Sequence, residues 1–214
     1  SGMAAALPGL EPLGVLEIPL SGTASLRLSE NGALSAGTAT IDLGRGAIAP
    51  GWRGDGRLPI DGGRLTFQYL SASRQLMMLP SRIHSGTSWG TFAGVVAQPA
   101  GTGHPLQIEV RGQEGMLGVA EFGIQPKPLE AFRLRASYAA GKGVLDIDEA
   151  VLRAAGGEIS LTGQVDASGP ATRTVIQGRM SAMSLEALKL LWPSPIAPNA
   201  RRWSGQQIKQ GRLA

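Results

Sequence analysis

The sequence repeats its own plan, and this repeat limits the folds open to the chain more than any other feature. Residues 64–96 align without a gap with residues 133–165, each position matching the one 69 residues later. Both segments read as three β-strands joined by glycine turns. Because stacked repeats bury one continuous apolar face, such a chain is expected to grow lengthwise. The matching pairs are Arg64 and Arg133, Leu65 and Leu134, Tyr69 and Tyr138, Leu76 and Leu145, Gly94 and Gly163, and Val96 and Val165.

The strands of the second segment alternate between apolar and polar residues. Leu134 and Tyr138 fall on one face, whereas Arg133 and Arg135 fall on the other. The alternation changes phase within residues 148–151. A strand has a side-chain period of two, so the sequence predicts a β-bulge or a tight turn at that point.

The apolar runs along the whole chain predict about twelve short strands and no regular alternation of strands with helices. This pattern indicates an all-β, mainly antiparallel body that is built from repeats. Sandwich, barrel and elongated curved sheet all fit the pattern, and we expect an elongated curved sheet or an open sandwich. The expected organisation is a tag scar and lead-in at residues 1–11, a first repeat-like segment at 12–57, a second unit at 58–126, a third unit at 127–183 and a helical segment at 184–214.

Turn residues mark the joints between these runs. Asn31-Gly32 is a strong hairpin signal, because both residues tolerate a positive φ. A strand is predicted over residues 13–20 and a glycine-rich connection over 44–56. Breaks are predicted over 98–105 and 125–128, where glycine or proline interrupts the apolar runs.

The period changes to a helical one near the C-terminus. Ser184 is a good N-cap residue for a helix that carries Leu185 and Leu188 at helical spacing. Proline follows at residue 193 and ends that helix. A second short helix is expected over residues 200–209, capped by Asn199.

Composition excludes several classes of function. The chain has no cysteine among its 214 residues, so it uses neither disulfides nor thiolate metal sites. Its net charge is +4, but the basic residues are scattered and do not interleave with aromatic ones, so we expect no nucleic-acid partner. No apolar run reaches the ~18–20 residues that span a bilayer.

The residues offer little for catalysis or metal binding. His84 and His104 have no acidic or cysteine partner at ligand spacing, so no metal or other cofactor is predicted. Ser88 lies in a G-x-S-x-G pattern, but a strand and not a helix is expected after it. Asp146 and Asp148 are typical of solvated carboxylates beside a turn. We therefore expect a protein that is not an enzyme, with Ser88 or the two aspartates as the less favoured catalytic alternative.

The repeated apolar face is the most informative feature. It is either covered by a second sheet or by the C-terminal helices, or it lines a groove that holds acyl chains, and the alternation is the same in both cases. The candidate lipid-contacting residues are Leu65, Phe67, Tyr69, Leu134, Tyr138, Leu145, Ile147, Ile159 and Leu161.

Two sequence patterns resemble a known family. One is the run LWP, APNARRW and GR within residues 191–212, and the other comprises FRLRASY, GVLDID and LRAAGGEISLTG within residues 132–163. Both resemble the AsmA-like superfamily of bacterial envelope proteins, and within it the large YhdP-like members. The likeness covers residues 58–214, and residues 12–57 fit as a preceding repeat.

The resemblance implies a curved β-sheet with an apolar groove, in a periplasmic protein that an N-terminal helix anchors in the inner membrane. It implies a role in phospholipid transport to the outer membrane, or in outer-membrane assembly and integrity. The chain has no such helix, so we expect an internal or C-terminal-region fragment that meets the membrane only through its parent protein. The partners implied are phospholipid acyl chains and other envelope proteins.

The alternative function is a structural or protein-binding β module of the cell envelope without lipid contact. In that case a sheet edge or the C-terminal segment docks the partner. The candidate docking residues are Trp192, Arg201, Arg202 and Trp203.

Overall fold

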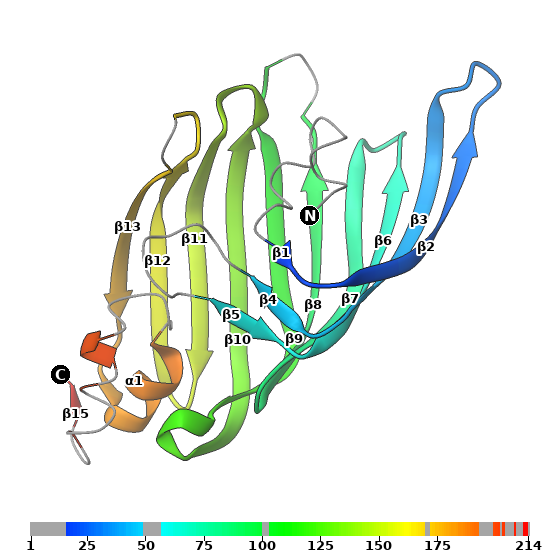
Figure 1. The fold of residues 1–214 in the computed structure, drawn as a ribbon. Coiled ribbons are helices and arrows are strands. Elements are labelled where there is room, and N and C mark those ends of the chain that lie inside the picture. Colours follow the sequence, from blue (N-terminus) through cyan, green and yellow to red (C-terminus); the bar gives the residue numbers. More distant parts are fainter. Residues whose placement is uncertain are drawn as a thin grey trace.

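The fold is dominated by one large antiparallel sheet, seen in a computed structural model (Figure 1). The structure describes residues 16–48, 57–99, 103–169, 172–192, 199–201, 203, 208 and 212–213. Ten strands form this sheet in the order β13-β12-β11-β10-β9-β8-β7-β6-β3-β2. Its members are β2 (Leu20–Leu28), β3 (Leu34–Leu43), β6 (Gly62–Leu70), β7 (Gln75–Ser85), β8 (Ser88–Ala97), β9 (Leu106–Val119), β10 (Ile124–Ala139), β11 (Val144–Ala154), β12 (Gly157–Asp166) and β13 (Arg173–Met180).

The strands follow one another in space as they do in sequence, with one excursion between β3 and β6. In that excursion β1 (Leu16–Glu17), β4 (Gly46–Ile48) and β5 (Leu58–Ile60) form a small sheet of their own, in the order β1-β4-β5. Figure 1 shows this small sheet in front of the large one, on the same side as helix α1 (Leu185–Leu191). The large sheet is open among the described residues, with β2 and β13 at its two edges. The expected all-β, mainly antiparallel curved sheet is thus confirmed.

The repeat in the sequence corresponds to a repeat in the backbone. Residues 64–96 cover β6, β7 and β8, and residues 133–165 cover β10, β11 and β12. Register shifts fall at matching places, over residues 78–81 in β7 and over 147–150 in β11. Left-handed conformations also match, at Arg74 (φ 53°) and Gly143 (φ 62°), and at Gly86 (φ 59°) and Ala155 (φ 51°).

The shift in β11 is the bulge that the change of phase predicted. Ile147 pairs with Gly163 and Ala150 pairs with Leu161. The two residues between them on β11 therefore stand opposite the single residue Thr162 of β12. The bulge lets side chains before and after it face the same side although the sequence alternation changes phase. The hairpin at Asn31-Gly32 is also confirmed, with Gly32 at φ 77° in the loop between β2 and β3.

Some joints differ from the sequence prediction. Residues 125–128 do not form a break but lie within β10, so the boundary expected between residues 126 and 127 falls inside a strand. The strand continues through the prolines because β10 still pairs with β9 there, with a register shift between Ile124 and Lys127. The connection expected over 44–56 contains strand β4, and its residues 49–56 lie outside the described residues. The strand expected over 13–20 is described from Leu16, where β1 ends at Glu17 and β2 begins at Leu20.

Helix α1 begins where the sequence predicted. The Ser184 hydroxyl accepts a hydrogen bond from the Ala187 backbone N–H at 3.1 Å, which satisfies one of the free donors of the first turn. The helix ends at Leu191, just before proline 193. Residues 199–201 and 203 are helical as well, so a second short helix follows, and it includes Asn199.

The main buried cluster lies where α1 meets the large sheet. Four leucines of α1 and Ala187 are buried against Ala154 and Ile159 of the sheet. A Cβ at Gly157 would lie 3.0 Å from the Ala187 Cβ, so the absence of a side chain there lets the helix approach β12 closely. Two short strands, β14 (Met183–Ser184) and β15 (Arg212–Leu213), pair beside it. Within the described part of the chain, no helix is long and apolar enough to cross a membrane.

Candidate functional site

Strand pairing collects the apolar residues on one face of the large sheet. Directly paired residues of an antiparallel sheet project to the same side, so a row of pairs can be followed across all ten strands. One such row is Ala24, Ala39, Phe67, Met78, Gly94, Val110, Leu134, Ala150, Leu161 and Gly178. The next is Leu26, Gly37, Tyr69, Leu76, Val96, Ile108, Ala136, Ile147, Gly163 and Ile176. We call this surface the apolar face.

The nine candidate lipid-contacting residues all lie on the apolar face. Phe67, Tyr69, Leu134, Ile147 and Leu161 belong to the two rows above. Leu65 pairs with Ile41, Tyr138 pairs with Leu145, and Ile159 pairs with Met180, so the remaining four continue the same side. The residues of the two repeats, far apart in sequence, therefore contribute to one surface.

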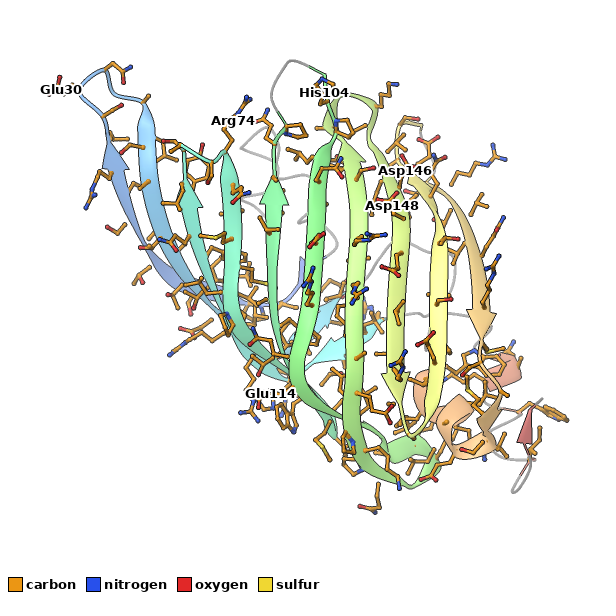
Figure 2. The ribbon with its side chains drawn as sticks, turned by 180° about the vertical axis from the view of Figure 1, so that it is seen from behind. Glu30, Arg74, His104, Glu114, Asp146 and Asp148 are labelled. Carbon is orange, nitrogen blue, oxygen red and sulfur yellow. The ribbon has the colours of Figure 1, made fainter. Side chains whose placement is uncertain are left out.

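The opposite face is polar and held by pairs between neighbouring strands. Arg64 donates to Asp42 at 2.7 Å, and Arg135 lies 3.3 Å from Glu149. Arg153 pairs with Glu158 in the same way. Figure 2 views the sheet from this side, with Asp146 and Asp148 labelled toward the ends of the strands. Ion pairs between neighbouring strands thus recur across this face.

Ion pairing and hydrogen bonding shift three pKa values on exposed side chains. The pKa of Arg64 is raised, first by its hydrogen bond to Asp42 and then by the charge of that carboxylate. The pKa of Arg153 is raised by the same two effects of Glu158. The pKa of Asp166 is lowered, because its carboxylate accepts hydrogen bonds from the side chain and the backbone N–H of Ser168. These groups stabilise the sheet and its turns and do not converge on a cleft.

The apolar face is incompletely covered by the described residues. Most of its side chains are half-buried, and toward the edges Leu26 is 66% exposed and Met180 is 58% exposed. Large contiguous apolar surfaces that remain exposed usually mark an interaction site or a ligand-binding groove. The face therefore stands out as a candidate binding surface.

Helix α1 covers one end of the apolar face and leaves a cavity beside it. The cavity has a volume of about 540 Å³. Strands β11, β12 and β13 form its floor, and the last turn of α1 forms one wall. The lining residues are Ile147, Ala150, Ile159, Leu161, Thr174, Ile176, Gly178, Met180, Leu188 and Trp192. We call this cavity the slot.

The C-terminal docking candidates are split between different environments. Trp192 lines the slot and is half-buried. Arg201 is buried, donates to Glu121 at 2.8 Å and lies 4.8 Å from the Phe122 ring centroid, so it ties the C-terminal segment to the turn after β9. Trp203 is 61% exposed. Arg202 lies outside the residues whose side chains are described.

Among the described residues, Ser88 and Asp146 make hydrogen bonds between neighbouring strands. Ser88 opens strand β8 after a hairpin turn, and its hydroxyl both donates to the Gly118 carbonyl and accepts from the Gly118 N–H at 3.0 Å. The strand-to-helix elbow that the pattern requires is therefore replaced by a strand pairing. Asp146 accepts a hydrogen bond from Gln164 at 2.7 Å. The described residues hold no cluster of His, Asp and Glu suited to a metal ion.

Sequence reasoning missed part of this surface. Thr174, Ile176, Gly178 and Met180 alternate with other residues along β13, but nothing in this alternation shows that α1 lies close to them. Likewise Leu26 and Ile41 belong to the apolar face, and their alternation was the signal that could have placed them there.

Comparison with known proteins adds no relative. No family model, no characterised protein and no solved structure matches the chain.

Proposed function

We propose that this chain is a non-enzymatic, lipid-contacting segment of an AsmA-like envelope protein, in which the apolar face holds phospholipid acyl chains. In this proposal the segment lies in the periplasm, as part of a protein anchored in the inner membrane. It serves phospholipid transport to the outer membrane or the assembly and integrity of that membrane.

The observation that carries the proposal is the asymmetry of the large sheet. Two unbroken rows of apolar or glycine residues, with Tyr69 as the only hydroxyl, cross all ten strands on one face. The other face is held by cross-strand ion pairs such as Arg64 with Asp42. Removing apolar area from water stabilises a contact by roughly 25 cal/mol per Å², so acyl chains on the half-exposed face gain free energy along its whole length.

A first experiment looks for bound lipid. The purified chain is measured by native mass spectrometry, and its organic extract is analysed for phospholipid. Near-stoichiometric lipid supports the proposal. A clean, monomeric protein without lipid, which also fails to take lipid from added vesicles, contradicts it.

A matched pair of variants locates the contact. Leu134→Asp places a charge on the apolar face of β10, and Val151→Asp places one on the opposite face of β11, where Val151 pairs with Arg133. Both residues are half-buried in central strands. The proposal expects lipid to be lost in the first variant and retained in the second, with both variants folded by circular dichroism. Equal loss in the two variants would point to a general effect on folding.

A second candidate function is a protein-binding module of the envelope. The supporting observation is β2, an edge strand of nine residues that is exposed throughout and carries Arg27 as its single charge. Unguarded edges of this kind accept a further strand. This function predicts saturable binding of an envelope protein in the absence of lipid. Ala24→Pro, at a position of β2 whose N–H points away from β3, would abolish that binding.

A further inference from the structure

We infer that the slot between α1 and strands β11–β13 seats one acyl chain lengthwise, with the methyl end of the chain against α1. The inference rests on the proposed function and adds to it a defined seat, an orientation and a stoichiometry.

The shape of the slot fits one extended chain. Its lining on β13 runs from Thr174 to Met180, which at about 3.3 Å per residue spans roughly 20 Å. A volume of about 540 Å³ over that length leaves a narrow space along the strands. The side chain of the central residue on this edge is absent, because position 178 is glycine, and the space above Gly178 belongs to the slot.

The chemistry of the slot fits hydrocarbon. The polar groups of the lining side chains are the Thr174 hydroxyl and the Trp192 indole N–H, and no charged side chain takes part. A polar or ionised group held there without a partner would cost several kcal/mol, so the buried part of the occupant has to be apolar. The acyl tail of a phospholipid is such a part, and we take a phospholipid as the occupant.

The two ends of the slot differ, which sets the orientation. At one end Leu188 and Trp192 of the C-terminal segment stand against Ile159 and Met180, and this wall is fixed by the buried cluster beneath α1. At the other end Thr174 is exposed to water. Apolar contact is greatest where α1 adds a second wall, and a polar head group placed away from α1 keeps its hydration, so the methyl end of the acyl chain points toward α1.

The slot also differs from the rest of the apolar face. Around Gly37 the face is a single layer, with Leu26 largely exposed and no helix opposite among the described residues. In the slot, α1 supplies a second wall, so the bound acyl chain contacts the sheet on one side and the helix on the other. The tightest binding is therefore expected here.

Two neighbouring residues of β13 provide a matched test of position. Gly178 faces the slot, where a Cβ would lie 3.0 Å from the Leu161 Cδ2, whereas the exposed Gln177 pairs with Thr162 on the opposite face of the sheet. The probe is parinaric acid, a fluorescent fatty acid, titrated into each folded variant. We expect Gly178→Phe to weaken binding about tenfold or more and Gln177→Phe to leave it within about twofold.

The outcomes separate the inference from the proposed function. If both variants weaken binding equally, or neither does, the chain is not seated in the slot, whereas the proposed function stands. If the unaltered protein binds neither parinaric acid nor phospholipid, both fail.

A second measurement tests orientation. In a variant with Trp192 as the sole tryptophan, the probe is a fatty acid brominated either at its methyl end or beside its carboxylate, since bromine quenches nearby indole fluorescence. Stronger quenching by the methyl-end bromine supports the inference, and the reverse order overturns the orientation. The same bromine on a phospholipid chain identifies the source, because only a phospholipid that enters the slot quenches as strongly as the free acid.

Discussion

Truncation of Leu191 to alanine tests how firmly α1 is held on the sheet. Leu191 is 1% exposed and contacts the buried cluster. Its Cδ1 would lie 3.1 Å from a Cβ at Gly157, so the space left by truncation borders a position that has no side chain to fill it. Leucine-to-alanine changes in a core cost about 2–5 kcal/mol, and a site that cannot collapse falls in the upper half, about 3–5 kcal/mol.

The free energy of unfolding is measured by urea denaturation, followed by tryptophan fluorescence and by circular dichroism. For a chain of this size, 3 kcal/mol corresponds to a fall in Tm of about 6–12 °C. The control is Leu26→Ala, which removes an exposed leucine from edge strand β2 and is expected to change stability by about 0.5 kcal/mol or less.

The result that refutes the reasoning is a small effect at position 191. A seven-residue helix is unstable alone, so α1 forms only through its contact with the sheet. If Leu191→Ala costs no more than Leu26→Ala, that contact contributes little, and α1 is no fixed wall for the slot. A fluorescence change that precedes the loss of β signal would show α1 detaching before the sheet unfolds.

Three smaller predictions concern polar groups. Ser184→Ala removes the N-cap of α1 and should cost about 1 kcal/mol in urea unfolding, with Ser184→Asp restoring most of it. Ser81→Ala should cost about 1–3 kcal/mol in thermal or urea unfolding, because Ser81 is 1% exposed and its hydroxyl accepts from the Thr66 N–H at 3.0 Å; a neutral result would mean that water replaces the hydroxyl. The pKa of Asp166 is lowered by Ser168, so its contribution to stability is present above the unfolded pKa of ~3.9 and is lost as pH falls through the lower folded value. Asp166→Asn should therefore flatten the acid limb of the stability profile, and an unchanged limb would contradict this assignment.

Local features followed well from the sequence. The phase change within residues 148–151 predicted a bulge or a tight turn, because a side-chain period of two requires one of them there, and the structure has a bulge in β11. The hydroxyl at Ser184 and the proline at residue 193 marked the two ends of α1. The loose repeat predicted two three-stranded units of one plan. The bulge and the two ends of α1 lie within a few residues of the sequence signals that predicted them.

Joints with mixed signals were less predictable. Prolines at residues 126 and 128 indicated a break, yet β10 continues through them. Pairing with β9 on one side, through a shifted register, outweighs the lost backbone donors. The glycines over residues 44–56 likewise predicted a connection, yet β4 lies there. Its pairing with β1 and β5 joins segments that are separate in the sequence, so no local pattern shows it.

The sequence alone determined which residues share a face, because alternation along a strand assigns each side chain to one side or the other. It named nine members of the apolar face in this way, from Leu65 to Leu161. Only the tertiary structure decided how much of that face is covered, since cover comes from elements distant in the chain. The approach of α1 to β11–β13, which brings Leu188 and Trp192 into one lining with residues of the three strands, creates the slot, and no period in the sequence encodes that approach.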